Sequence, residues 1–162
     1  MLKKIGTLAI ACLISACSMP TFFESNDLNT NTTKIDQQSY AYAYDITVQG
    51  KKGMVTENFY VDKFNQGVRD WYNHRILVPI DEIQNTLYKN GSGHNSQNYA
   101  YFSGVVFAYE LRDKLKLFSQ NCYHAIDVPS LSLGIQDAMV DLKNQEPKDF
   151  EKTTEQFLKT CS

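Results

Sequence analysis

The stretch VDKFNQGVRDW, residues 61–71, recurs without a gap as VPSLSLGIQDA, residues 128–138. Valine, glycine and aspartate coincide in the two copies, and Phe64 and Val68 are matched by leucine and isoleucine. The apolar positions lie three and four residues apart, which is the spacing of one face of an α-helix. The repeat therefore predicts two equivalent helices, around which the rest of the chain can be placed.

A shorter repeat precedes each of these helices, because Tyr99-Ala100-Tyr101 reproduces Tyr40-Ala41-Tyr42. The alternation of residues 40–48 suits a β-strand, yet the same residues also fit helical spacing. The second copy opens a longer segment in which apolar residues recur at helical spacing as far as Leu115. Both copies are therefore predicted to be helical.

A third helical stretch follows each repeated helix, and the polar segment NGSGHNS, residues 90–96, separates the two copies. The predicted fold is all-α, with two tandem three-helix units over residues 39–90 and 97–161. We expect the two units to pack on each other as an intramolecular pseudo-dimer. A domain-swapped homodimer is the alternative.

The N-terminal segment carries Lys3 and Lys4, then an apolar run, then ISAC at residues 14–17. This pattern resembles the processing site of bacterial lipoproteins. The resemblance implies that residues 1–16 are removed as a signal peptide and that Cys17 is lipidated. In that family, a serine such as Ser18 after the cysteine goes with sorting to the outer membrane.

The segment after the lipidation site, residues 17–38, is rich in asparagine, threonine, serine and aspartate. Such a composition is typical of a flexible tether. We therefore expect the folded part to lie in the periplasm, anchored to the membrane by its lipid.

Two of the four cysteines remain once Cys12 has left with the leader and Cys17 has been lipidated. In an oxidising periplasm, Cys122 and Cys161 are expected to form a disulfide. Cys122 lies in an internal segment that makes the second copy longer than the first. An alternative is a reactive Cys122 thiol paired with His124.

The chain has 162 residues, of which 43% are hydrophobic and 21% are charged, as in soluble globular proteins. Without Lys3 and Lys4, the mature chain has 14 basic and 18 acidic residues, a net charge of −4. A negative charge gives little electrostatic support to nucleic-acid binding, so we expect no nucleic-acid partner.

Ser39-Tyr40-Ala41, FNQGVRD (residues 64–70) and IDEIQ (residues 80–84) follow one another in the first copy. In order and spacing they resemble the N-terminal dimerisation domain of periplasmic FKBP-type peptidyl-prolyl isomerases, including the macrophage infectivity potentiator group. The resemblance implies interlaced helices that cradle polypeptide clients. Because the catalytic FKBP domain has no counterpart here, it implies a non-catalytic holding chaperone or partner tether.

Gly67 and Gly134 are predicted to lie where helices cross closely. The predicted helix seam and binding surface comprises Tyr40, Tyr44, Phe64, Gly67, Val68, Trp71, Tyr99, Leu131, Gly134, Ile135 and Met139. Ordinary core packing would account for these residues equally well.

No metal, cofactor or catalytic residue is predicted. The three histidines are scattered, and neither a phosphate-binding glycine loop nor a serine-nucleophile motif is found.

Two further partner hypotheses follow from resemblance. Phe102-Ser103-Gly104, with Cys122 and Cys161, resembles small all-α immunity proteins that bind one toxin. The first copy could alternatively dock on a full-length FKBP-type isomerase as a heterodimer.

Overall fold

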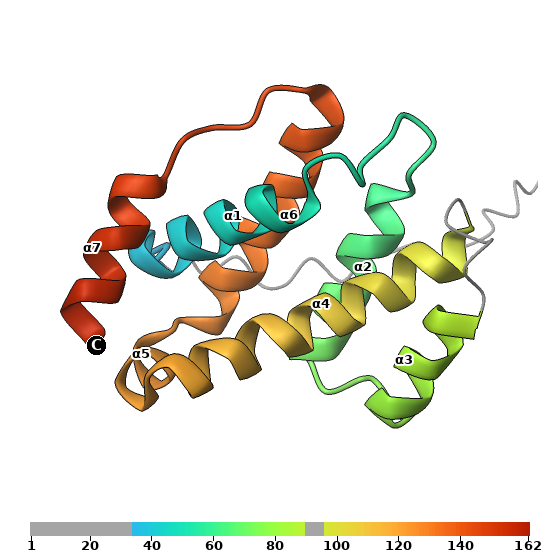
Figure 1. The fold of residues 1–162 in the computed structure, drawn as a ribbon, viewed down its shortest axis with the longest axis horizontal. Coiled ribbons are helices and arrows are strands. Elements are labelled where there is room, and N and C mark those ends of the chain that lie inside the picture. Colours follow the sequence, from blue (N-terminus) through green and yellow to red (C-terminus); the bar gives the residue numbers. More distant parts are fainter. Residues whose placement is uncertain (1–33, 90–95) are drawn as a thin grey trace, which may run out of the picture. The chain divides into compact units, whose positions relative to one another are not determined.

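The computed structural model describes residues 34–89 and 96–162, and Lys34–Ser162 form one compact unit. Every regular element in these ranges is helical, so the all-α prediction is confirmed. The helices, labelled in Figure 1, are α1 Gln37–Lys51, α2 Val61–Tyr72, α3 Ile80–Lys89, α4 Gln97–Phe118, α5 Gln120–Ala125, α6 Val128–Asn144 and α7 Glu151–Cys161.

The segment that fits both strand and helix spacing, residues 40–48, is part of α1. Its N-terminus is capped by Asp36, whose carboxylate accepts a hydrogen bond from the Ser39 amide at 2.7 Å. Ser96 caps α4 in the same way, through the amide of Tyr99. Both caps satisfy amides that a helix start leaves without partners, which favours a helix over a strand here.

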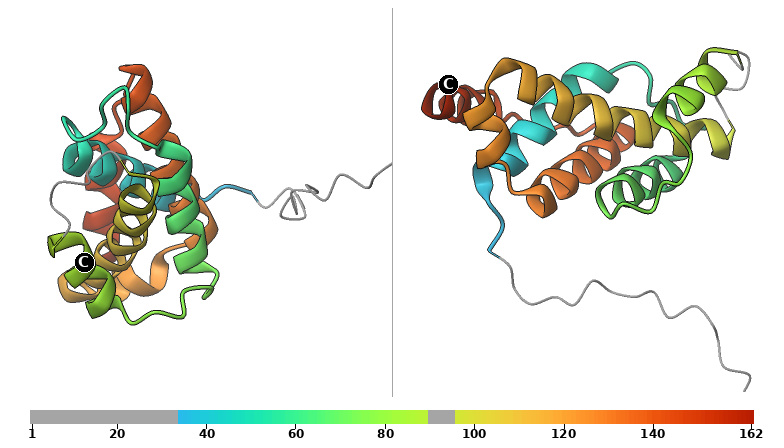
Figure 2. Two further views of the ribbon diagram at one scale, coloured as in Figure 1. Left: turned by 90° about the vertical axis from the view of Figure 1, so that its right-hand side faces the viewer. Right: turned by 90° about the horizontal axis from the view of Figure 1, so that it is seen from below.

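Helices of one sequence copy pack mainly against helices of the other copy. We call α1, α6 and α7 one exchanged group, and α2, α3 and α4 the other. α1 packs mainly against α6 and α7, whereas α4 packs mainly against α2 and also contacts α3 and α5, and α2 meets α6 between the two groups. Figure 2 shows α1 lying beside α6 and α4 crossing α2. The principal partners of α1 and α3 are therefore helices of the second copy. The pseudo-dimer that the repeat suggests stays a prediction.

The longer segment of the second copy contains the short helix α5, which the sequence does not predict. Ser119 ends α4 and also caps α5 by accepting from the Cys122 amide. Asp127 then caps α6 through the Ser130 amide at 2.9 Å. The chain turns back at this end of α4 because successive helices begin at capping residues.

The buried core is aliphatic and aromatic and runs through both exchanged groups. Its fully buried large side chains include Tyr44, Phe64, Leu131, Ile135 and Met139. Within residues 34–89 and 96–162, no helix is both long and apolar enough to cross a bilayer.

Candidate binding site

The two glycines of the long repeat lie at the closest helix crossings. A Cβ atom on Gly67 would overlap the backbone carbonyl oxygen of Tyr101 in α4. A Cβ atom on Gly134 would overlap the carbonyl oxygen of Tyr40 in α1. Since backbone atoms cannot move aside as a flexible side chain can, both positions require glycine for the observed spacing.

The same two tyrosines also bind the aspartates of the repeat. The Tyr40 hydroxyl donates to Asp137 at 2.9 Å, and the Tyr101 hydroxyl donates to Asp70 at 3.1 Å. The structural counterpart of Tyr40 is therefore Tyr101. The repeated Tyr-Ala-Tyr triplets align Tyr40 with Tyr99 instead. That alignment differs by two residues from the one that the hydrogen bonds define.

The remaining predicted seam residues differ in their burial and position. Fully buried in the core are Tyr44, Phe64, Val68, Leu131, Ile135 and Met139. Trp71 is half-buried and meets the ring of Tyr109 edge to face. Tyr99 lies apart from the seam, on the wall of a pocket.

This pocket lies between the end of α1, α3 and the first half of α4, and its volume is about 350 Å³. That volume falls in the range of ligand-binding clefts. We call it the Lys51 pocket. Its lining residues are Lys51, Met54, Gln84, Leu87, Tyr88, Tyr99, Ser103, Val106, Phe107 and Glu110.

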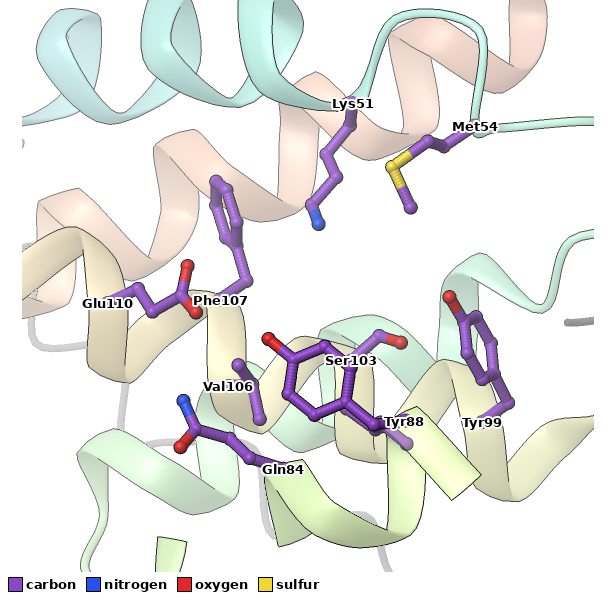
Figure 3. Close-up of a pocket in the computed structure, with 10 residues that line it drawn as sticks. Lys51, Met54, Gln84, Tyr88, Tyr99, Ser103, Val106, Phe107 and Glu110 are labelled. Atoms are coloured by element: carbon purple, nitrogen blue, oxygen red, sulfur yellow. The ribbon is translucent and has the colours of Figure 1, made fainter. Parts of the chain in front are cut away.

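The most unusual group in the pocket is the ammonium of Lys51. In Figure 3 the side chain leaves the end of α1 and points toward α4, beside the ring of Phe107. Its Nζ lies 4.7 Å from the centre of that ring and 5.7 Å from the centre of the Phe64 ring. Burial lowers the pKa of Lys51 below its ordinary value.

Among the residues that the structure describes, the Lys51 ammonium forms no ion pair or hydrogen bond. The nearby carboxylate of Glu110 pairs instead with Lys114, at 3.5 Å. Lys51 is thus a partly desolvated cation that lies against aromatic rings, with the Glu110 charge acting on it from a distance rather than in an ion pair. An anionic group that entered the pocket would supply a direct ion pair.

The other exchanged group shows why the pocket is open. With Tyr40 matched to Tyr101, Ser103 stands at the position of Tyr42 in α1. The ring of Tyr42 packs on Phe157 of α7, with 5.6 Å between ring centres. In the pocket, the smaller Ser103 is found instead. Its smaller volume leaves the space unfilled.

Of the residues that line the pocket, only Tyr99 belongs to the predicted helix seam. The usable signal was the smaller side chain in one copy of the repeat, Ser103 against Tyr42. That signal depends on the register that the tyrosine–aspartate hydrogen bonds set.

A disulfide joins Cys122 of α5 to Cys161 of α7, so Cys122 carries no free thiol to pair with His124. The Ser119 hydroxyl also donates to the carbonyl oxygen of Cys161, at 3.0 Å. Cys17, predicted to be lipidated, lies outside the described residues. Across residues 34–89 and 96–162, no three His, Cys, Asp or Glu side chains are grouped to hold a metal ion.

Comparisons with known proteins correct the isomerase resemblance. Residues 33–162 match the family described as "Uncharacterised lipoprotein". The chain is also 42% identical over 176 residues to an uncharacterised protein of Haemophilus influenzae, in an alignment that covers all of this chain and 98% of the relative. No solved structure matches the chain.

The resemblance to the dimerisation domain of FKBP-type isomerases is therefore wrong, and the expected docking on such an isomerase loses its basis. Its motif of glycine followed by aspartate has a structural explanation here. Gly67 permits the close approach of α4, and Asp70 accepts the hydroxyl of Tyr101 at the same crossing. A motif that serves helix packing carries little information about family. The chain belongs to a family of uncharacterised lipoproteins.

Proposed function

We propose that this lipoprotein is a non-catalytic binding protein, which holds one polypeptide partner at the cell envelope through the Lys51 pocket. The observation that carries the proposal is the partly buried ammonium of Lys51, which forms no direct ion pair among the described residues and feels the Glu110 charge only from a distance. The partner is expected to supply a carboxylate to Lys51 and an apolar side chain to the wall around it.

A polypeptide fits better than a small molecule because apolar exposure continues beyond the pocket. Tyr88 is 82% exposed on α3, and Leu77 is 95% exposed in the connection that leads to α3. Met54 is also exposed, on the turn after α1. Exposed apolar side chains at and near a charged anchor are typical of a protein interaction surface.

The proposed place of action is the periplasmic face of the outer membrane. The family is one of lipoproteins. Ser18, directly after the predicted lipidated Cys17, supports sorting to the outer membrane. A partner held by the folded part would thereby be kept near that membrane.

Site-specific photocrosslinking in living cells tests the proposal. A photoreactive phenylalanine analogue replaces Tyr88 at the pocket in one strain and Val140, exposed on α6, in a control strain. We expect one discrete adduct from position 88 and none from position 140.

Three outcomes would contradict the proposal. They are the absence of any adduct, the same adduct from both positions, and a broad ladder of adducts, which is the pattern of a holding chaperone. An immunity role corresponds to the case in which the single partner is a toxin.

A further inference from the structure

We propose that the end of α4 opposite the Lys51 pocket rests on an anionic lipid surface. We call this end the α4 tip, formed by Leu117, Phe118, Lys114 and Lys116. The proposal concerns contact between the folded part and the bilayer, in addition to the lipid anchor, and is independent of the polypeptide partner.

Leu117 and Phe118 form an exposed apolar pair in the last turn of α4. Leu117 is 80% exposed and Phe118 is 59% exposed, whereas the neighbouring Leu115 is buried in the core. A bilayer interface would remove both exposed side chains from water.

The charges beside this pair have the sign that anionic lipids attract. The side chain of Lys114 is 73% exposed, and Lys116 is exposed as well. From Glu110 to Phe118, α4 carries these two lysines and Arg112 against Glu110, which pairs with Lys114, and Asp113, so the net charge of this stretch is +1. Basic residues flanking apolar ones are typical of segments that rest on a membrane surface.

The chain that leads to the lipid anchor starts at the same end of the molecule. The amide of Asp36, just before α1, donates to the Ser130 hydroxyl at 2.9 Å, and the Asp127 amide donates to the Ser39 hydroxyl at 2.9 Å. α6 therefore begins beside the start of α1, immediately after α5 and the α4 tip. In the right-hand view of Figure 2, the segment that leads into α1 leaves the molecule at the end where α5 lies.

The length of the connecting chain makes weak docking sufficient. From Cys17 to Lys34 the chain can span at most about 60 Å. A surface tethered within that distance meets the bilayer at a high effective concentration. Two apolar side chains and a few basic residues are therefore enough to keep the α4 tip on the bilayer for much of the time. The pocket-lining residues of α4 end at Glu110, about 12 Å along the helix from Phe118, so docking at the tip would hold the Lys51 pocket away from the bilayer.

Fluorescence quenching by brominated lipids tests the proposal on the full lipidated chain. The vesicles contain phosphatidylethanolamine and brominated phosphatidylglycerol in equal parts, and Trp71→Phe removes the native tryptophan. Phe118→Trp then reports on the tip, and Tyr88→Trp reports on the opposite end. We expect severalfold stronger quenching of Phe118→Trp, and equal quenching of the two reporters would overturn the proposal.

Charge reversal separates lipid docking from passive proximity to the anchor. In the Phe118→Trp protein, Lys116→Glu is expected to reduce quenching several-fold. Lys89→Glu, an equal charge change at the far end, is expected to leave quenching unchanged. Circular dichroism confirms that each variant is folded. Quenching that is insensitive to Lys116→Glu would overturn the role of anionic lipid.

Discussion

At the scale of single residues, Gly67 and Gly134 set the distance between crossing helices. Each allows a backbone carbonyl oxygen of the facing helix to lie where a Cβ atom would be. The close approach also brings the hydroxyls of Tyr101 and Tyr40 within hydrogen-bonding distance of Asp70 and Asp137. The glycines, which lack a Cβ atom, and the tyrosine–aspartate hydrogen bonds are therefore parts of the same helix crossings.

Gly67→Ala is expected to lower the free energy of unfolding by roughly 1–3 kcal/mol, because the added methyl overpacks the crossing. Gly50→Ala is the matched control, since its Cβ would meet only the Phe107 side chain, at 3.8 Å. The control should gain up to about 1 kcal/mol from helix propensity. Urea denaturation measures both changes, and equal stability of the two variants would show that the crossing is not tightly packed.

Stability is expected to fall at alkaline pH through the buried tyrosines. Burial and the hydrogen bond to Asp70 raise the pKa of Tyr101 to about 12, and burial raises the pKa of Tyr42 to about 12. In the unfolded chain, tyrosine loses its proton near pH 10. Between pH ~10 and ~12 the folded state holds more protons, so stability decreases as pH rises.

Urea midpoints measured below pH ~10 and near pH ~11.5 test this dependence. Tyr101→Phe should reduce the loss on raising the pH, even though it lowers stability at neutral pH by removing a hydrogen bond. An unchanged pH dependence in Tyr101→Phe would contradict the assignment.

At the scale of helices, α3 and α7 occupy corresponding places but are held differently. α7 buries Thr154 and Phe157, donates from the Thr154 hydroxyl to the Ala41 carbonyl oxygen, and is joined to α5 by the disulfide. α3 buries only Ile83. A helix with few buried contacts opens more readily than one that is crosslinked.

Amide hydrogen exchange is therefore expected to be faster in α3 than in α7, by at least roughly tenfold, or ~1.4 kcal/mol of local opening free energy. Mass spectrometry of peptides from each helix measures the difference. Reduction of the disulfide should accelerate exchange in α7 and leave α3 unchanged. Equal protection of the two helices in the oxidised protein would contradict this account.

The disulfide is also expected to stabilise the whole fold. It closes a loop with a sequence separation of 39 residues, which corresponds to roughly 3–4 kcal/mol in the chain-entropy model. The double variant Cys122→Ala and Cys161→Ser should lose about this free energy of unfolding in urea. A loss well below 1 kcal/mol would show that α7 is held by its other contacts.

At the scale of the whole molecule, the sequence predicts the helices better than their partners. The spacing of Phe64, Gly67 and Val68 is local, so helix type can be inferred directly. The exchange of α1 and α4 depends on contacts between residues far apart in the sequence, 97 positions for Tyr40 with Asp137 and 31 positions for Tyr101 with Asp70. The matching Tyr-Ala-Tyr triplets favoured the alignment of Tyr40 with Tyr99, whereas the structure matches Tyr40 with Tyr101. Identical residue types do not reveal which tyrosine hydroxyl reaches an aspartate.

The Lys51 pocket was not predictable for a related reason. It lies where Ser103 takes the position that Tyr42 fills in the other exchanged group, by packing on Phe157. That difference becomes visible only once the two groups are superposed in the correct register. Lys51 itself lies at the end of α1, where a lysine is ordinary in sequence because it complements the helix dipole.

In the proposed function, the Lys51 ammonium binds a carboxylate of the polypeptide partner. The most direct measurement is photocrosslinking from position 88 in cells that carry Lys51→Met, compared with the unaltered lysine and with Lys52→Met. We expect Lys51→Met to abolish the adduct, because methionine keeps the apolar stem but lacks the cation. Lys52→Met, at the exposed neighbouring position, should preserve the adduct. An adduct of undiminished yield in Lys51→Met would contradict the claim.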